Sequence, residues 1–145
     1  MTISFTIPGE PQGKARPRVV KNKYTGRSVS YTPAKTAAYE ELVRAEYIRA
    51  APMIKFDGPV MVTVKAYLGI PESKSKKTKT QMQSGAILPT KKPDCDNIAK
   101  IVCDALNGLA YNDDSQITKL VVAKFYDNKP HVRVLIEEDE EVKNI

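Results

Sequence analysis

Five aspartates lie close together in residues 92–117, KPDCDNIAKIVCDALNGLAYNDDSQI, of a chain whose formal net charge is +6. Asp94 and Asp96 are separated by one residue, and Asp113 and Asp114 are adjacent. Carboxylates held this close repel one another unless a cation relieves the repulsion. Their oxygens are hard ligands that suit Mg²⁺ or Mn²⁺, which retain waters that can act as nucleophiles. The spacing therefore favours a divalent-metal site.

Helix capping is the competing explanation for the first two aspartates. Asp94 and Asp96 stand at the expected start of a helix, where carboxylates cap free N–H groups and interact favourably with the helix dipole. A calcium loop of the EF-hand type does not fit, because counting from Asp94 puts Ala99 where glycine is required and Ala105 where glutamate is required. A cysteine nucleophile is disfavoured, since no histidine lies near Cys103 in the sequence.

Lys100 adds a cation to the same segment. It lies four residues after Asp96 and four before Asp104. On a helix this spacing gives surface ion pairs of only about 0.3–0.5 kcal/mol. Beside a metal, an ammonium can also stabilise charge that develops on a phosphate, or position the attacking water. Metal, carboxylates and lysine together suggest phosphodiester hydrolysis.

These side chains must be positioned by a helix, which we expect over residues 94–107, ended by Gly108 in the left-handed conformation. At about 100° per residue, five apolar residues fall on one side: Ile98, Ile101, Val102, Ala105 and Leu106. Five polar residues fall on the other: Asp96, Asn97, Lys100, Asp104 and Asn107. The polar side would carry the chemistry.

The rest of the chain predicts an α+β fold in a single domain over residues 1–145. Alternation predicts strands at residues 2–8 and 60–68 and a hairpin at 18–32 that turns near Thr25-Gly26. A helix is expected from Pro33 to Ala51, with Thr32 as its N-cap.

Three further elements are expected. Residues 71–92 hold six lysines and one glutamate, and predict a mobile loop with a short helix at 74–83. Strands at 117–126 and 131–137 are expected to pair as a hairpin. The acidic residues 137–145 predict a solvated end.

Composition excludes several classes. The chain is 41% hydrophobic and 28% charged, and no apolar run approaches the ~20 residues of a membrane span. With no signal-peptide pattern, we expect a cytoplasmic protein without membrane contact. Cys95 and Cys103 lie too far apart along one helix for a disulfide, and with His131 as the single histidine a structural zinc site lacks ligands.

Charge is unevenly distributed along the chain. Residues 1–92 hold 17 Lys/Arg against 6 Asp/Glu, whereas residues 93–145 hold 6 against 11. A basic body around an acidic centre is typical of a phosphate-binding surface, and so of a nucleic-acid partner.

The pattern K-P-D-x-D-N-I-x-K-x-x-x-D-A-L-N-G, followed by D-D-x-Q-I, resembles the RusA-like Holliday junction resolvases, which are Mg²⁺-dependent endonucleases of bacteria and phages. The stretch PGEPQGKARPRV is similar to the basic N-terminal segment of phage-type members. The resemblance implies an α+β fold with a mixed β-sheet packed against helices, and a homodimer. It further implies paired symmetric nicks in four-way junctions, in DNA recombination and repair or in phage DNA processing.

The resemblance also implies roles for single residues. Asp94, Asp96 and Asp114 would be the essential carboxylates, Lys100 would be required for cleavage, and Asp113 would support the metal. The cofactor would be Mg²⁺, with Mn²⁺ able to substitute, and no small-molecule cofactor is expected. Eight cations are candidates for contacts with the DNA backbone: Lys14, Arg16, Arg18, Arg27, Lys76, Lys77, Lys91 and Lys92.

Two alternative functions remain. A catalytically inactive module that binds branched DNA would keep the basic surface but would not need every acidic ligand. A metal-dependent phosphatase of small substrates would need the carboxylates but not the wide basic body. All the acidic positions and the basic body are present together, which favours the endonuclease.

Overall fold

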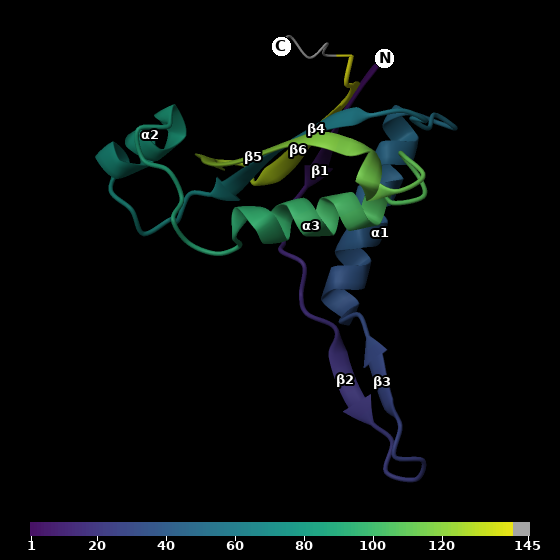
Figure 1. Cartoon of the computed structure of the whole chain (residues 1–145). Coiled ribbons are helices and arrows are strands. Elements are labelled where there is room, and N and C mark those ends of the chain that lie inside the picture. Colours follow the sequence, from purple (N-terminus) through teal and green to yellow (C-terminus); the bar gives the residue numbers. More distant parts are fainter. Residues whose placement is uncertain (141–145) are drawn as a thin grey trace, which may run out of the picture.

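Four strands form a mixed sheet in the order β1-β6-β4-β5 (Figure 1). A computed structural model of the chain describes residues 1–140, apart from the side chain of Arg18. The strands are β1 (Thr2–Pro8), β4 (Val60–Gly69), β5 (Ile117–Asp127) and β6 (His131–Glu138). Strand β6 pairs antiparallel with β1 and with β4, whereas β4 and β5 are parallel. The α+β class and the mixed sheet are thus confirmed.

Helices α1 (Ala34–Ala50) and α3 (Cys95–Leu106) lie on one side of this sheet (Figure 1). Every second residue of β4 is buried toward them, as the alternation in the sequence predicts. Tyr47 of α1 meets Phe5 of β1 edge-on, with 5.7 Å between ring centroids. The five apolar residues predicted to share one side of α3 are all 0% exposed, so that prediction is confirmed.

The ends of α3 also agree with the sequence. Asp94 occupies the N-cap, Asn107 the C-cap, and Gly108 follows with a φ of 79°. The start of α1 differs from the prediction, because Pro33, not Thr32, occupies the N-cap and no side chain caps the helix. Proline already fixes the φ of the residue that leads into the first turn, so the helix begins one residue later.

The predicted hairpin between β5 and β6 is wrong. Strand β4 lies between them and pairs with both. The three linking residues, 128–130, span about 10 Å when extended, which is twice the ~4.8 Å between neighbouring strands. The short link therefore crosses over the end of β4, whose apolar residues occupy the centre of the sheet.

The lysine-rich segment contains α2 (Lys76–Ser84), close to the expected helix. Ser75 Oγ accepts a hydrogen bond from the Thr78 N–H at 3.2 Å, and Gly85 ends the helix with a φ of 86°. The predicted solvated end overlaps β6 at its start, and its last residues, 141–145, lie outside the described part.

The hairpin predicted in the basic N-terminal region is confirmed as β2 (Arg18–Lys21) and β3 (Ser28–Tyr31). It projects away from the sheet, beyond the start of α1 (Figure 1). Among the described residues, no helix has both the length and the apolar character needed to cross a membrane.

Candidate active site

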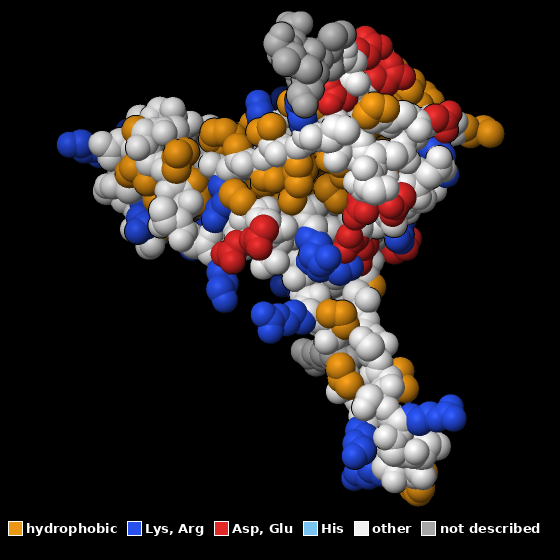
Figure 2. All heavy atoms as spheres, in the orientation of Figure 1, with side chains coloured by type: hydrophobic (Ala, Val, Ile, Leu, Met, Phe, Trp, Pro, Cys, Tyr) orange, Lys and Arg blue, Asp and Glu red, His pale blue; other side chains and the backbone are white. Residues whose placement is uncertain are grey.

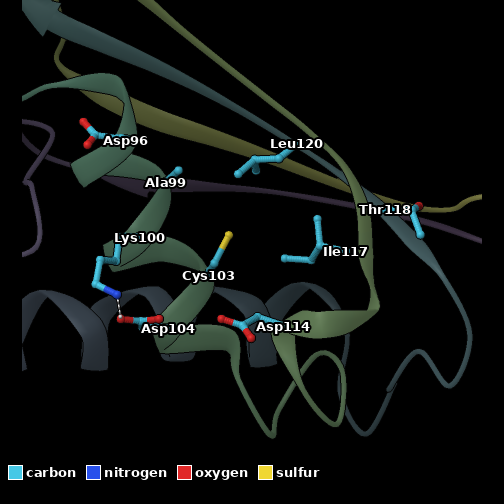
Figure 3. A pocket seen from close by; sticks show the side chains of 9 residues that line it. All are labelled: Asp96, Ala99, Lys100, Cys103, Asp104, Asp114, Ile117, Thr118 and Leu120. Atoms are coloured by element: carbon cyan, nitrogen blue, oxygen red, sulfur yellow. Dashed lines mark ion pairs between the residues drawn. The ribbon is translucent and has the colours of Figure 1, made fainter.

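A cleft of about 460 Å³ lies between α3 and β5. Helix α3 buries its apolar side, so its polar side forms one wall of the cleft (Figure 3). The short helix η1 (Asp114–Gln116) and the start of β5 form the rest. The lining residues are Asp96, Ala99, Lys100, Cys103, Asp104, Asp114, Ile117, Thr118 and Leu120. The cleft therefore joins three of the four predicted catalytic residues, from two segments of the chain.

The acidic side chains occupy the two ends of this cleft. Asp96 lies at one end, and Asp104 and Asp114 lie at the other (Figure 3). The eight residues from Asp96 to Asp104 correspond to about 12 Å of helix. Figure 2 likewise shows the acidic side chains of this face in separate groups, with Lys/Arg side chains between some of them.

Asp94 faces a second hollow rather than the cleft. This hollow has a volume of about 360 Å³ and is lined by Asp94, Asn97, Lys92, Pro93 and residues 11–14. In the part of the chain that the structure describes, no three acidic, histidine or cysteine side chains are placed to hold one metal ion. The carboxylates predicted to be ligands are exposed, but Asp94 and Asp96 line different hollows, and the described residues do not gather them around one point.

Asp114 is held in place by an asparagine from the end of α3. Asn107 Oδ1 accepts a hydrogen bond from the Asp114 N–H at 2.9 Å. Gly108 lets the chain turn back after the helix, and its N–H donates to the Tyr111 carbonyl at 2.9 Å. The N-G of the sequence pattern therefore brings Asp114 back to the helix that carries Asp96.

Gln116 fixes the same loop from the other side. Its Oε1 accepts hydrogen bonds from the N–H groups of Asn112 at 2.7 Å and Asp113 at 3.2 Å. Its Nε2 donates to the carbonyls of Phe56 at 3.0 Å and Gly58 at 2.9 Å. Asn107 and Gln116 both stand in the sequence pattern, which predicts no role for them, and the structure shows them as supports of Asp114.

Asp113, predicted to support the metal, does not line the cleft. Hydrogen bonding, first from the Ser115 side chain and then from backbone N–H groups, lowers the pKa of its carboxyl. Its described contacts therefore serve the turn that presents Asp114.

Lys100 belongs to a chain of charges that runs from the wall of the cleft to Lys14 and α1. Its Nζ lies 3.7 Å from Asp104 Oδ2. On the other side, Lys14 Nζ lies 3.5 Å from the same oxygen and 3.0 Å from Glu40 Oε1. The Lys14 side chain is only 16% exposed, and its backbone N–H donates to the Asn97 carbonyl at 3.1 Å. Lys14 thus ties the N-terminal segment to α1 and α3, so its predicted contact with DNA competes with a structural role.

Cys103 forms part of the floor between the acidic ends. Burial, and then the charges of Asp104 and Asp114, raise the pKa of its thiol to about 11. The Tyr111 hydroxyl donates to the Cys103 carbonyl at 2.7 Å beneath it. The thiol stays protonated at neutral pH, which weakens it as a nucleophile.

The other predicted DNA contacts lie on exposed parts of the surface. Arg27 is on the β2–β3 hairpin, Lys76 and Lys77 begin α2, and Lys91 and Lys92 lie just before Asp94. Lys91 Nζ is 6.0 Å from the centre of the Tyr126 ring. Arg16 is exposed, whereas the side chain of Arg18 lies outside the described part of the structure. Contact of these residues with DNA stays a prediction.

Two comparisons with known proteins bear on this site. The family model for the endodeoxyribonuclease RusA matches residues 8–137, which include the whole cleft and the basic N-terminal segment. An uncharacterized protein of Bacillus subtilis, YqaN, is 42% identical over 139 residues, which cover 94% of this chain and 96% of that protein. The chain therefore belongs to the RusA endodeoxyribonuclease family.

Proposed function

We propose that the protein is a Mg²⁺-dependent, structure-selective endodeoxyribonuclease that resolves four-way DNA junctions by paired symmetric nicks. One observation carries the proposal: Asp96, Lys100 and Asp114 line a single surface cleft in a chain of this family. The family supports a DNA substrate, and the acids and the lysine supply groups that phosphodiester hydrolysis uses. We propose that it acts in the cytoplasm, as expected from the sequence.

The donors suit a divalent ion by type. Asp94, Asp96 and Asp114 are exposed, and no ion pair among the described residues satisfies their charge. Carboxylate oxygens are the ligands that Mg²⁺ and Mn²⁺ prefer. The carboxylates of one chain are not placed close enough together to form a complete metal site, because the described residues contain no group of three such ligands.

A second copy of the chain would bring two of these donors, Asp96 and Asp114, together. The acidic ends of the cleft are separated by an apolar floor that includes Ala99, Ile117 and Leu120, the last 47% exposed. Leu120 is the exposed part of this floor, and its apolar side chain favours contact with protein rather than with phosphate. A twofold-related copy across this face would bring the Asp96 end of one chain to the Asp114 end of the other. Twofold symmetry would also supply the two matched sites that paired nicks require.

The residues of this chain have separate tasks in the proposed reaction. When bound, the metal supplies an activated water and stabilises the leaving oxygen. Lys100 places a positive charge beside the scissile phosphate, and Asp104 restrains its Nζ from one helical turn away. Asn107 and Gln116 hold the Asp114 loop, so its carboxylate does not need to reorganise when the substrate arrives.

Incubation of the protein with a labelled four-way junction, a matched duplex and a generic phosphoester, with and without Mg²⁺ or Mn²⁺, tests the proposal. We expect nicking of the junction that depends on the metal and occurs at opposed strands. Junction binding without nicking would favour the inactive module instead. Hydrolysis of the phosphoester with no preference for DNA would favour the phosphatase.

A further inference from the structure

The β2–β3 hairpin, residues 18–31, forms an arm that stands out from the molecule (Figure 1). Every described side chain from Val19 to Thr32 is exposed, and the core has no member between Ile7 and Tyr39. An isolated two-stranded hairpin is marginally stable at best in water. Because the arm adds nothing to the core, its length is best explained by contact with another molecule.

The charge of the arm indicates what kind of molecule would bind it. Residues 18–31 contain four Lys/Arg and no Asp/Glu. Lys14 is paired with Glu40, but Lys21, Lys23 and Arg27 are exposed and take part in no ion pair among the described residues. These three cations lie at or next to the turn between β2 and β3, and Figure 2 shows Lys/Arg side chains gathered toward the tip of the arm. A twofold copy of the same arm would bring like charges together, so a polyanion fits better than a second copy.

The tip of the arm presents an aromatic ring. Asn22 Oδ1 accepts hydrogen bonds from the N–H groups of Tyr24 at 2.8 Å and Thr25 at 3.3 Å. Gly26, with a φ of 69°, closes the turn through a 2.9 Å hydrogen bond from its N–H to the Asn22 carbonyl. The side chain of Tyr24 is 98% exposed. The turn is therefore built by its own hydrogen bonds, and the ring is left without a packing role.

We propose that residues 18–31 grip branched DNA: the cations at the turn end of the hairpin neutralise phosphates, and Tyr24 stacks on a base left unstacked at the branch point. This inference rests on the proposed function and adds to it a means of telling a junction from a duplex. In an uninterrupted duplex the faces of the bases are closed by their neighbours, whereas an accessible base can stack on an aromatic ring without regard to sequence. Tyr24 therefore adds affinity only where the DNA offers such a base.

The aromatic part is tested with Tyr24→Ala and Tyr24→Phe. Affinity is measured in chelator, so that no cleavage occurs, for a four-way junction with 2-aminopurine at the branch point and for a duplex of matched sequence. We expect Tyr24→Ala to bind the junction about 10-fold more weakly and the duplex unchanged, with Tyr24→Phe close to wild type. The wild type should change the 2-aminopurine fluorescence, and Tyr24→Ala should not. Equal junction affinity of wild type and Tyr24→Ala would overturn the stacking proposal.

The ionic part is tested with two double variants that remove the same charge. Lys21→Ser with Arg27→Ser changes the arm, and Arg49→Ser with Lys55→Ser changes the far end of α1 and the loop after it. If the arm contacts phosphates, only the first pair should lower the slope of log affinity against log salt, by about 2. The same slope for both pairs would show that net charge alone acts, and would overturn the contact.

Replacement of residues 20–29 by Asn-Gly removes the arm while leaving a two-residue hairpin turn. Because the arm holds no core residue, this variant should melt within a few degrees of wild type and keep the wild-type oligomeric state, yet lose junction selectivity. Loss of selectivity together with dissociation into monomers would overturn the proposal in favour of an arm that binds a second copy. Nicking of the junction by the wild type with Mg²⁺ is measured separately. Absence of nicking by the wild type would contradict the proposed endonuclease activity, whereas unchanged junction selectivity of the shortened variant would contradict the role proposed for the arm.

Discussion

Lys100 is the residue whose structural and chemical roles are easiest to separate. Its side chain is 62% exposed, and its ion pair with Asp104 spans 3.7 Å. An exposed pair of this kind contributes about 0.5 kcal/mol or less to the free energy of unfolding. A charge placed beside a scissile phosphate contributes far more to the rate.

Lys100→Ala should therefore slow nicking of a four-way junction by about 100-fold or more while moving the melting temperature by about 2 °C or less. Single-turnover nicking and thermal melting measure the two effects. Lys100→Arg keeps the charge and serves as the partial-rescue variant. An unfolded Lys100→Ala protein, or one that nicks at the wild-type rate, would contradict the role given to this residue.

Lys14 shows the opposite balance. Its side chain is 16% exposed and that of Glu40 is 11% exposed, with 3.0 Å between Nζ and Oε1. Lys14→Ala leaves the buried Glu40 without its cation, which should lower the free energy of unfolding by about 3 kcal/mol. Urea denaturation measures the loss, and Arg16→Ala, an exposed cation two residues away, should cost about 0.5 kcal/mol or less.

The double variant Lys14→Met with Glu40→Leu replaces both charges by apolar groups and should recover most of that stability. If the double variant is as unstable as Lys14→Ala, the ion pair is not the cause. If Lys14→Ala is fully stable and only DNA binding falls, Lys14 is the DNA contact that the sequence predicted.

At the scale of elements, the loop between α3 and β5 decides where Asp114 lies. Gln116 holds this loop with four hydrogen bonds, two accepted and two donated. Gln116→Ala should lower the nicking rate at saturating DNA by about 10-fold or more, because Asp114 then samples other positions. Junction affinity in chelator should not change. Gln83→Ala removes a glutamine that bridges α2 and the end of β5, and is the matched control.

Wild-type nicking by Gln116→Ala would show that the loop needs no support from this side chain. An equal loss in Gln83→Ala would point to a general loss of stability. Melting curves of both variants separate these outcomes from a specific effect on Asp114.

The elements that the sequence predicted well are those with a local signal. Helix α3 carries a complete apolar side and a glycine after its end, so its bounds and its buried side follow from spacing alone. The prediction of a β5–β6 hairpin fails because strand pairing depends on which strand occupies the centre of the sheet, and a short connection between two strands does not determine this.

The candidate site follows the same division. The sequence indicated which aspartates and which lysine share a face, because helical spacing fixes that. It did not indicate that Asp96 and Asp114 stand at opposite ends of the cleft, since that distance depends on how η1 and β5 return to α3. The supports Asn107 and Gln116 were visible as letters in the pattern, but their backbone partners could not be read from it.

At the scale of the whole molecule, the separated acids make the proposed dimer testable by mixing. Asp96→Asn and Asp114→Asn chains should each be inactive alone. When equal amounts are unfolded and refolded together, about half of the dimers are mixed, and each mixed dimer keeps one site with both wild-type carboxylates. Nicking should recover to about a quarter of the wild-type rate. No recovery, with mixed dimers shown to form, would place the complete site within one chain.

The measurement that tests the central claim most directly compares wild type with Asp94→Asn, Asp96→Asn and Asp114→Asn on one labelled four-way junction. The wild type should nick opposed strands only with Mg²⁺. Each variant should lose nicking, yet bind the junction in chelator as well as wild type or better, because one charge that repels the DNA is gone. Asp104→Asn, whose carboxylate pairs with Lys14 and Lys100, should be milder. Full nicking by Asp96→Asn, or an equal loss of junction binding in all three variants, would contradict the metal-site assignment and leave helix capping and loop structure as the roles of these aspartates.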